Sequence, residues 1–490
     1  MFLLIFARYS LSMKLDTLQC SNPYLSLPDV CYDRVMPSPL VKPYLLHAND
    51  SVAFLLNIDT TELEHESFVD VVNGTQILEG VEPFAMCYAG HQFGHYVPRL
   101  GDGRAINIGT INGLHLQLKG AGQTKYSRSG DGRAVLRSSI REYLMSEAMH
   151  GLGIGTSRAL AIIGSEHKVY REAWERGSVV LRVSPSWIRF GTFEYFAHTK
   201  RYSELEVLAD YAIAESYPQL LALPDRYLLF FTEVVEKTAS LMAAWMAVGF
   251  SHGVMNTDNM SIHGITIDYG PFAFLDDYDV NYICNHTDQG GRYSFGNQPA
   301  AAEWNLRALM VALSPLVRIE RMEVVLSGYT MLYEVEYLRL MRAKLGLQTE
   351  AVEDMDLVKH LLGTLQTLSI DYTLFFRTLS HYTGDRTPLL MLGLYHDPLH
   401  MWLDSYDKRL ETEQMSLEER QRKMQQTNPK YVLKNYMLQE AIEAAQEGDF
   451  SLVEALFVLA QNPYDEHTVY EDWAGATPER YKNQKLSCSS

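Results

Sequence analysis

The segment 251–270, SHGVMNTDNMSIHGITIDYG, constrains the fold and the chemistry of this chain more than any other stretch. Within it, Asn259 offers an amide oxygen and Asp268 a carboxylate, and both are hard ligands that suit Mg²⁺ together with phosphate oxygens and water. A second carboxylate, Asp258, stands directly before Asn259. The segment has strand-like character within a region of helical patterns, so we expect a metal-binding loop set into a helical lobe.

Kinase-like enzymes that act on small molecules carry a related pattern, in which His-Gly-Asp is followed by an Asn and then by a strand ending in Asp-Phe-Gly. Here His252 and Gly253 are present, and Asp268 begins the later triplet. The position of the catalytic Asp, however, is occupied by Val254. The chain retains the metal ligands and has gained the carboxylate of Asp258. We therefore expect a nucleotide in a different orientation, which presents a different phosphorus to the acceptor.

The order of patterns along the chain predicts an α+β, protein-kinase-like bilobal fold with extensions at both ends. Prolines break segment 1–80, which we interpret as an N-terminal extension. Alternating runs such as RAINIG and LHLQLKG and one helical interval predict a strand-rich N-lobe over 81–204. Helical patterns such as RYSELEVLADYAIAE and AAAEWNLRALMVALSPL predict a helical C-lobe over 205–425, with the catalytic and metal-binding loop. A helical C-terminal tail follows over 426–490.

The size and charge of the chain exclude several classes of function. With 490 residues, 47% of them hydrophobic, it can bury a large core in more than one lobe. The net charge of −18 argues against nucleic acid and anionic membranes as partners, because both are bound mainly through Lys and Arg. No stretch reaches transmembrane length, and the short apolar run before Met13 lacks the features of a secretory signal, so Met13 is an alternative start.

The five cysteines are scattered without Cys-x-x-Cys spacing, so they indicate neither a zinc site nor a dense disulfide framework. We therefore expect the reducing cytoplasm as the location. We also expect the protein to be a monomer.

A lysine at the end of one strand pattern and a glutamate in the following helical pattern are candidates for nucleotide binding. Lys119 ends the run LHLQLK, and Glu142 lies in SSIREYLMSEAMHGLG. Kinase-like folds hold such a lysine against nucleotide phosphates through an ion pair with such a glutamate. The alternative is a surface lysine and a solvated glutamate. The order of the motifs favours nucleotide binding.

Two similar glycine-rich segments lie on either side of Lys119 in the sequence. LGDGRA contributes Gly101, Gly103 and Arg104, and SGDGRA contributes Asp131 and Gly132. Glycine lets backbone N–H groups approach phosphate oxygens closely, and an adjacent arginine adds a charged fork. Neither word is a Walker A loop or a dinucleotide fingerprint, and each alone is compatible with a simple tight turn. Their position around the lysine favours a phosphate cradle.

Two arginines lie in the otherwise apolar and aromatic stretch VVLRVSPSWIRFGTFEYF. Arg182 and Arg189 each need an anion if they are buried there. That anion is either a carboxylate in a structural ion pair or a phosphate, and we predict that both arginines are phosphate ligands.

Two histidines in the word AGHQFGH have a spacing that would suit a metal ion on a helix. His91 and His95 are surrounded by glycines, however, which argue against a helix. We therefore interpret both as structural histidines.

Longer words of the sequence resemble the selenoprotein O family of protein adenylyltransferases. They cover most of the chain: YAGHQFG, RLGDGRA, QLKGAGQTKYSRSGDGRA, SPSWIRFGTFEYF, HGVMNTDNMSIHGITIDYGPF, NQPAAAEWNL and NPKYVLKNY. Members of that family have a pseudokinase domain that binds ATP in a flipped orientation and transfers AMP. The resemblance implies ATP and Mg²⁺ or Mn²⁺ as cofactors, and protein substrates that bear Ser, Thr or Tyr hydroxyls.

The resemblance also implies roles for single residues. Asp258 would be the catalytic base, and Asn259 and Asp268 would hold the metal ion. Lys119 and Glu142 would form the ion pair. The residues in contact with ATP would be Gly101, Gly103, Arg104, Lys119, Asp131, Gly132, Arg182, Arg189 and Asp268.

Some members of the family carry selenocysteine near the carboxyl end, where this chain has Cys488. From this feature we predict a reversible disulfide between Cys488 and Cys284, which would tether the tail over the catalytic lobe and restrict access of protein substrates. The alternative is a tolerated surface thiol near a free terminus.

These observations predict a protein adenylyltransferase. A Ser, Thr or Tyr hydroxyl of a protein would attack the α-phosphorus of ATP and release pyrophosphate, with Asp258 as the general base. Two alternatives stay open: a kinase-like γ-phosphotransferase, and an inactive nucleotide-binding pseudokinase scaffold.

Overall fold

The chain forms two compact units, which are assembled from alternating segments of the sequence. The computed structural model describes residues 13–482 and residue 486. The first unit contains the described residues up to Tyr88, together with Arg99–Ser139 and Ser157–Trp187. The second contains Ala89–Pro98, Ile140–Thr156 and the described residues from Ile188 onwards.

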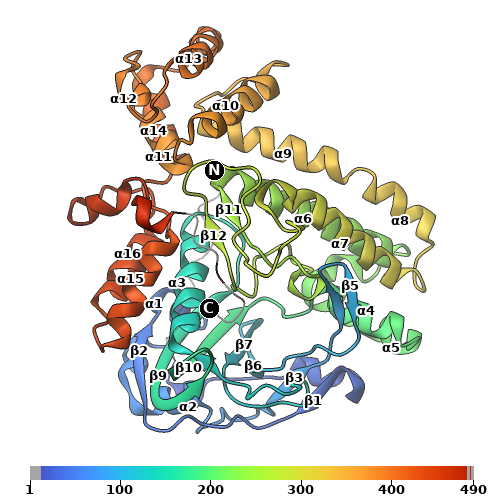
Figure 1. Ribbon diagram of the computed structural model, residues 1–490. Coiled ribbons are helices and arrows are strands. Elements are labelled where there is room, and N and C mark those ends of the chain that lie inside the picture. The colour runs from blue at the N-terminus through green and yellow to red at the C-terminus, as the bar shows by residue number, and fades with distance from the viewer. Residues whose placement is uncertain (1–12, 483–485, 487–490) are drawn as a thin grey trace. The chain divides into compact units, whose positions relative to one another are not determined.

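The first unit is built on an antiparallel sheet (Figure 1). Its strand order is β1-β3-β6-β7-β10-β9-β2, and β8 also pairs with β10. The strands are β1 (Tyr32–Arg34), β2 (Pro43–Ala48), β3 (Phe84–Met86), β6 (Ala105–Ile111), β7 (Leu114–Lys119), β8 (Ala134–Val135), β9 (Arg158–Tyr170) and β10 (Trp174–Ser184). The predicted strands at RAINIG and LHLQLKG are therefore confirmed as β6 and β7.

The turn between β6 and β7 shows why these residues form a hairpin. It consists of Asn112 and Gly113, which have φ values of 51° and 76°. An Asn-Gly pair tolerates positive φ at both positions, and this conformation gives a two-residue turn whose twist matches that of the strands. The hairpin places Lys119 at the end of β7, opposite Ala105 on β6 and Val180 on β10.

Two short helices cover the sheet of the first unit and complete its core. They are α1 (Asp50–Leu55) and α2 (Glu66–Asn73). Phe68 and Val72 of α2 pack against buried aliphatic side chains of the sheet, such as Leu118 and Leu181. This burial of apolar surface stabilises the unit.

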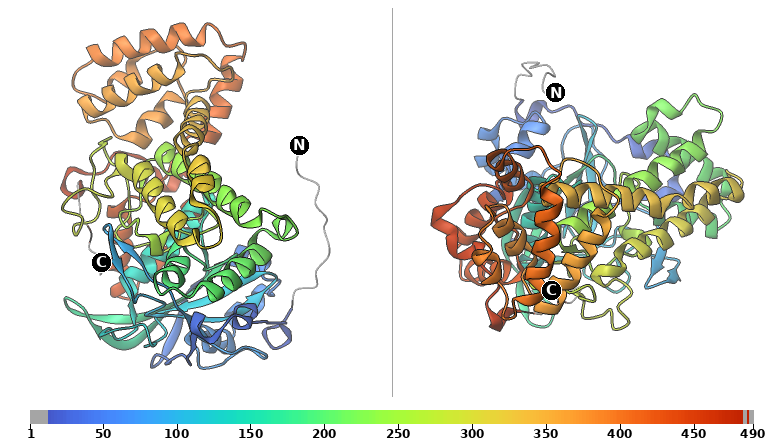
Figure 2. Two further views of the ribbon diagram at one scale, coloured as in Figure 1. Left: turned by 90° about the vertical axis from the view of Figure 1, so that its right-hand side faces the viewer. Right: turned by 90° about the horizontal axis from the view of Figure 1, so that it is seen from above.

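The second unit is mostly helical (Figures 1 and 2). Its helices are α4 (Phe190–His198), α5 (Tyr202–Ser216), α6 (Arg226–Val248), α7 (Gln298–Leu313), α8 (Ile319–Leu326), α9 (Tyr329–Lys344), α10 (Asp354–Leu368), α11 (Tyr372–Leu379), α12 (Thr387–Leu390), α13 (Asp397–Leu410), α14 (Leu417–Thr427), α15 (Asn435–Gln446) and α16 (Ser451–Gln461). It also contains the hairpin β4 (Gly90–Gln92) and β5 (His95–Val97) and the ribbon β11 (Phe250–Ser251) and β12 (Ala273–Phe274). Helix α3 (Leu136–Gly151) begins in the first unit and continues in the second.

Aromatic and aliphatic side chains from α6, α9, α10, α11 and α13 form a large core in the second unit. Trp402, Tyr372 and Phe376 are among its buried members. The helices α15 and α16 pack against α3, where Tyr143 stacks on Phe457. These contacts are long-range in sequence, so the tail from residue 426 is part of the packed second unit.

The observed units differ in their boundaries from the predicted division at residues 80, 204 and 425. Segment 1–80, interpreted as an extension, contributes β1, β2, α1 and α2 to the first unit, because its apolar side chains fill the core under the sheet. The mixed α and β character with a separate sheet and separate helices agrees with the predicted α+β class.

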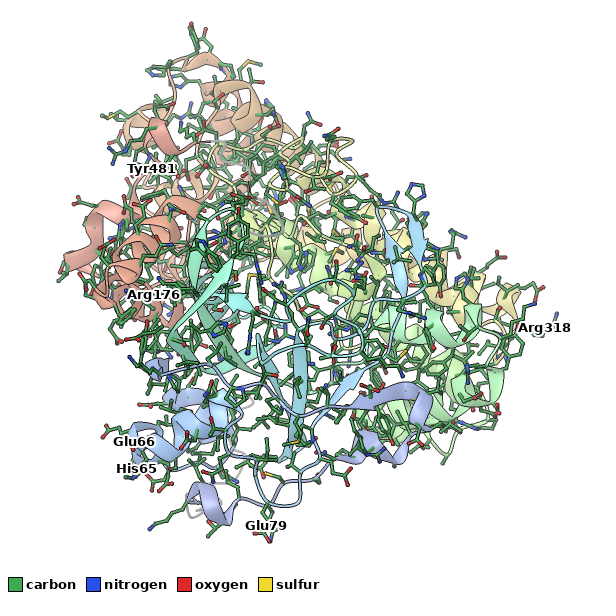
Figure 3. The ribbon with its side chains drawn as sticks, turned by 60° about the horizontal axis from the view of Figure 1, so that its bottom comes forward. His65, Glu66, Glu79, Arg176, Arg318 and Tyr481 are labelled. Carbon is green, nitrogen blue, oxygen red and sulfur yellow. The ribbon has the colours of Figure 1, made fainter. Side chains whose placement is uncertain are left out.

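Charged side chains lie at the surface of each unit. Figure 3 shows side chains of His65, Glu66 and Glu79 at the exterior of the first unit, and these three residues are exposed. Arg318, just before α8, is an exposed residue of the second unit. Among the described residues, every helix is either too short or too polar to cross a lipid bilayer.

Candidate active site

A short antiparallel ribbon in the second unit brackets the segment that the sequence singled out. Helix α6 ends at Gly249, whose φ of 77° lies in the left-handed region that glycine adopts without strain. The chain then enters β11, where Phe250 pairs with Phe274 of β12. Residues 252–272 form the loop between the two strands, so both ends of this catalytic loop are fixed to each other.

His252 holds the catalytic loop in shape. Its Nε2 donates to the carbonyl of Ile267 at 3.0 Å, and its Nδ1 accepts from the N–H of Val254 at 3.3 Å. The ring stacks on Trp245, and its own N–H donates to the side chain of Gln298 at 2.8 Å. Burial lowers the pKa of His252, so the imidazole is neutral and serves as a structural clamp.

Asp258 is a buried carboxylate with the properties of a general base. It lies in a short 3-10 turn, Thr257–Asn259, and its Oδ2 accepts from Nε2 of Gln92 at 3.3 Å. Its Oδ1 has no hydrogen-bond partner among the described residues. Desolvation by burial raises the pKa of Asp258 to about 7, although the positive charge of Arg189 opposes this shift. A carboxylate that titrates near neutrality can accept a proton at physiological pH.

Arg189 connects Asp258 to Asp268. Its Nη1 donates to the main-chain oxygen of Asp258 at 2.9 Å and to Oδ2 of Asp268 at 2.6 Å. Arg189 is 2% exposed, whereas the side chain of Asp268 is 21% exposed. Asp268 has a φ of 57°, a left-handed conformation that is uncommon for a residue other than glycine and that aims its carboxylate at this site.

Three oxygen donors in this loop suit a hard divalent cation. Asn259 uses its Nδ2 to donate to the carbonyl of Val254 at 2.9 Å, which leaves its Oδ1 for a ligand. The carboxylates of Asp258 and Asp268 belong to the same hydrogen-bonded loop. Amide and carboxylate oxygens fit Mg²⁺ or Mn²⁺, and the unsatisfied Oδ1 of Asp258 indicates a polar neighbour supplied by a ligand.

The β4–β5 hairpin also contributes to the site, and sequence reasoning did not assign it a role. The N–H of His91 donates to Oγ1 of Thr257 at 2.7 Å, and the next residue, Gln92, contacts Asp258. A side chain at Gly90 would place its Cβ 2.9 Å from Oγ1 of Thr257, so glycine is required for the close approach. The glycine-rich segment YAGHQFG was the sequence feature that could have indicated this role, but only the fold shows that it contacts Thr257 and Asp258.

The buried carboxylate of Asp102 holds the first glycine-rich loop, LGDGRA, in place within the first unit. Gly101 has a φ of 75°, and the side chain of Tyr126 fills the space where a Cβ would lie. The neighbouring Asp102 accepts from the N–H of Met86 at 2.9 Å and from Nε2 of Gln117 at 3.2 Å. These bonds hold the loop that presents Gly103 and the exposed Arg104.

Arg182 is buried in the first unit and lies close to this network. Its guanidinium donates to Oε1 of Gln117 and lies 4.6 Å from the ring centre of Trp187. Arg189 has a carboxylate partner in Asp268.

The other predicted nucleotide contacts of the first unit are Lys119, Asp131 and Gly132. Asp131 forms a two-pronged ion pair with Arg171, with distances of 2.8 and 2.9 Å, and this pairing lowers its pKa. Gly132 has a φ of 69°, and a Cβ there would overlap the main chain of Gly122. Lys119 belongs to the first unit and Glu142 to the second, and their ion pair stays a prediction.

Cys284, one of the two predicted redox cysteines, lies beside the catalytic loop. Its thiol donates to the carbonyl of Pro271 at 2.8 Å, and burial raises its pKa to about 12. The main-chain N–H of Leu486 donates to the carbonyl of Cys284 at 2.9 Å. Cys488 lies outside the described residues, so the predicted pairing is not tested by the structure.

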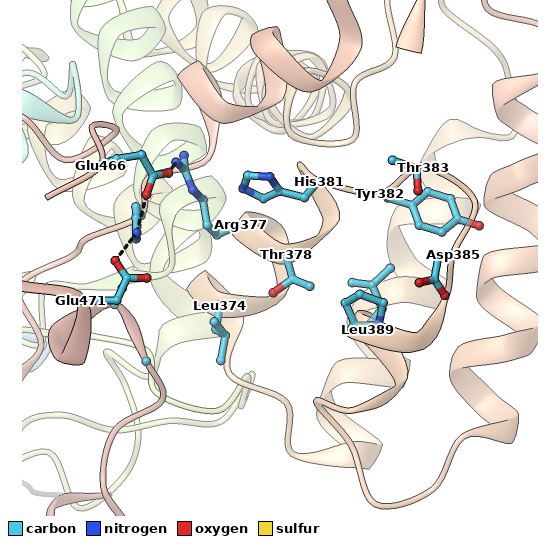
Figure 4. A pocket seen from close by; sticks show the side chains of 14 residues that line it. Leu374, Arg377, Thr378, His381, Tyr382, Thr383, Asp385, Leu389, Glu466 and Glu471 are labelled. Atoms are coloured by element: carbon cyan, nitrogen blue, oxygen red, sulfur yellow. Dashed lines mark hydrogen bonds and ion pairs between the residues drawn. The ribbon is translucent and has the colours of Figure 1, made fainter. Parts of the chain in front are cut away.

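A cavity of about 610 Å³ opens elsewhere in the second unit (Figure 4). Its charged groups neutralise one another, since Glu466 binds both Arg377 and Lys430, and Glu471 binds Lys430 as well. None of the predicted site residues lines it. The lining residues are Leu374, Arg377, Thr378, His381, Tyr382, Thr383, Asp385, Pro388, Leu389, Lys430, Glu466, Glu471, Ala474 and Gly475.

The combination of glycine-rich loops in a sheet unit with a buried carboxylate and further oxygen ligands in a helical unit is typical of enzymes that transfer groups from nucleotides. Comparison with known proteins identifies the family. The family profile described as "Protein adenylyltransferase SelO" matches residues 14–461, and the chain belongs to this family.

Curated relatives agree with this assignment. The chain is 47% identical to "Protein nucleotidyltransferase YdiU" of Myxococcus xanthus (strain DK1622) over 485 residues, which cover 97% of this chain and 99% of that protein. It is 45% identical over 484 residues to the protein of the same name from Pseudomonas fluorescens (strain Pf0-1), again with 97% and 99% coverage. The Thiobacillus denitrificans (strain ATCC 25259 / T1) relative is 46% identical over 486 residues, with the same coverage.

The raised pKa of Asp258 predicts a pH-dependent effect on stability. Because the folded state keeps a proton that an unfolded Asp loses near its ordinary pKa of about 4, the contribution of this group to stability falls as pH rises from about 4 to 7. Asp258→Asn removes the titration. We expect its melting temperature, measured by differential scanning fluorimetry, to exceed that of the wild type by more at pH 8 than at pH 5.

Asp356→Asn, on the exposed side of α10, is the matched control and should leave the pH dependence unchanged. An equal gain for Asp258→Asn at both pH values would contradict the raised pKa.

Proposed function

We propose that this protein transfers AMP from ATP to hydroxyl groups of protein substrates and releases pyrophosphate. The observation that carries the proposal is Asp258: a buried carboxylate with a pKa near 7, directly beside the metal-ligand pair Asn259 and Asp268. The names of the family and of the relatives, which refer to adenylyl and nucleotidyl transfer to protein, support the same reaction. We also propose that the two compact units correspond to the N-lobe and C-lobe of a protein-kinase-like fold.

In the proposed mechanism, Asp258 accepts the proton of a Ser, Thr or Tyr hydroxyl of the protein substrate. The hydroxyl oxygen attacks the α-phosphorus, the bond from that phosphorus to the bridging oxygen breaks, and pyrophosphate leaves. Asn259 and Asp268 would hold Mg²⁺ or Mn²⁺, which supplies neutralisation of phosphate charge. Gln92 orients the carboxylate of Asp258 by donating a hydrogen bond to its Oδ2. The other oxygen, Oδ1, is then available to accept the proton of the substrate hydroxyl.

The basic and glycine-rich residues predicted from the sequence would bind the nucleotide. Lys119, in an ion pair with Glu142, would contact the phosphates, together with Arg182 and Arg189. The remaining proposed ATP contacts are Gly101, Gly103, Arg104, Asp131, Gly132 and Asp268. The monomeric state and the cytoplasmic location stay predictions.

ATP labelled at a single phosphorus tests the proposed reaction directly. The purified protein is incubated with a protein acceptor and with ATP that carries ³²P at either the α- or the γ-position. We expect label on protein from α-labelled ATP alone, and free labelled pyrophosphate from γ-labelled ATP. Protein label from the γ-position alone would make the chain a kinase, and label from neither would make it a binding scaffold.

Substitutions of the two carboxylates should separate catalysis from nucleotide binding. Asp258→Asn keeps the shape of the side chain and removes the base, so we expect ATP affinity to stay close to wild type and the rate to fall by about 10²–10⁴. Asp268→Asn weakens the metal site, so metal-dependent ATP binding and activity should both be lost. Isothermal titration calorimetry and the labelling assay measure the two quantities. Equal loss of ATP binding in both variants would assign Asp258 to the metal ion.

The predicted disulfide between Cys284 and Cys488 would regulate access of protein substrates. The contact between Leu486 and Cys284 supports it, because the chain passes Cys284 two residues before Cys488. Because burial raises the pKa of Cys284, its thiol is a poor nucleophile, so the thiolate of Cys488 would first attack a small-molecule disulfide such as oxidised glutathione and release one thiol. The sulfur of Cys284 would then displace the second thiol from this mixed disulfide, which forms the Cys284–Cys488 bond. We expect peptide mass mapping of oxidised protein to find the Cys284–Cys488 link, and dithiothreitol to raise the activity of the wild type but not of Cys488→Ser. Activity that is independent of dithiothreitol, with no linked peptide, would exclude the disulfide.

A further inference from the structure

A cluster of histidine and glutamate side chains lies on β4 and α4, next to the catalytic loop, and takes no part in the proposed reaction. It consists of His91 on β4 and of Glu194 and His198 on α4. One potential ligand atom from each of the three residues lies within 4.8 Å of the others. On a helix, residues four apart lie on the same face, so Glu194 and His198 point together toward the hairpin.

The carboxylate of Glu194 is the feature that calls for a cation. The residue is 1% exposed, and its Oε2 binds Nδ1 of His91. Its Oε1 is buried and has no hydrogen-bond partner in the described part of the chain. A buried carboxylate oxygen without a partner is unfavourable, and a single bond from one imidazole leaves this oxygen unsatisfied. A metal ion that binds the carboxylate would remove that cost.

Aromatic side chains form the walls of the cluster. Trp304 of α7 meets the ring of His91 edge to face, with 5.2 Å between ring centres. Tyr96 of β5 stacks on His198 at 3.8 Å. His198 itself is exposed. The cluster therefore has a buried charged end at Glu194 and an entrance from solvent at His198.

We propose that His91, Glu194 and His198 bind a zinc-type transition-metal ion with a solvent molecule in the fourth position. Two imidazole nitrogens and one carboxylate oxygen match Zn²⁺ and do not match Mg²⁺, which prefers oxygen ligands alone. Bonds of about 2.0–2.2 Å in a tetrahedral site place ligand atoms roughly 3.5 Å apart. The candidate ligand atoms lie within 4.8 Å of one another and would move closer together when an ion binds.

The position of the cluster in the fold gives the ion a positioning role. It would join β4 to α4, and β4 is the strand whose next residue, Gln92, binds the carboxylate of Asp258. The main chain of His91 itself binds Thr257. At its other end, α4 is preceded by its N-cap residue Arg189, which contacts Asp258 and Asp268. The metal ion would therefore fix both supports of the catalytic carboxylate.

This inference does not depend on the proposed activity, so its test uses metal binding to the full chain without ATP. The protein is stripped with a chelator, dialysed against Zn²⁺ and analysed by inductively coupled plasma mass spectrometry. We expect one bound Zn²⁺ per chain, and visible d–d absorption when Co²⁺ replaces it. Amide hydrogen exchange of residues 89–98 should slow when Zn²⁺ is added.

Two variants remove ligands and two serve as controls. His198→Ala, at an exposed position that does not threaten folding, should weaken Zn²⁺ binding at least about tenfold, as should Glu194→Gln. His95→Ala alters an exposed histidine of the same hairpin, and Asp268→Asn alters the proposed Mg²⁺ site; both should keep wild-type Zn²⁺ affinity.

The proposal is overturned if the wild type binds no more Zn²⁺ than His198→Ala, or if binding is lost in Asp268→Asn or His95→Ala and kept in His198→Ala. Zn²⁺ binding that leaves the exchange of residues 89–98 unchanged would overturn the positioning role.

Discussion

The buried guanidinium of Arg189 is the interaction on which the catalytic loop depends. It binds the main chain at Asp258 and the side chain of Asp268, so it joins the two halves of the loop. The β11–β12 ribbon, in comparison, joins only the two ends of the loop. The main chain follows the same route, since the N–H of Phe190 donates to the carbonyl of Met260 at 2.9 Å. Hydrogen bonds between charged groups, such as the one from Arg189 to Asp268, are stronger than those between neutral groups.

The same arginine also affects the pKa of the proposed base, Asp258. Burial favours the neutral form of Asp258, whereas the positive charge of Arg189 favours the ionised form, and desolvation is the larger of the two effects. The result is a carboxylate that titrates near neutrality. A fully solvated aspartate would be ionised but a weak base, and a buried one without a cation nearby would hold its proton too tightly.

Local sequence patterns predicted the elements that carry the site. Alternation of apolar residues predicted β6 and β7, and the 3.6-residue period predicted α5 and α7. The role of segment 1–80 was harder to predict, because its prolines suggested a loop-rich extension. Its strands are short edge elements that become stable only through pairing with neighbours such as β3 and β9. The glycines around His91 correctly argued against a helix, since β4 and β5 form a hairpin there.

The sequence by itself determined the family, and it predicted the metal-ligand pair Asn259 and Asp268 and the carboxylate of Asp258. These features lie in contiguous stretches of the chain, so they are visible without the fold. Only the tertiary structure decided that Asp258 is buried and bound by Gln92, 166 residues away, and that His91 meets Glu194 across 103 residues. Periodicity constrains near neighbours alone, whereas these contacts and the resulting pKa arise from packing between segments that are distant in sequence.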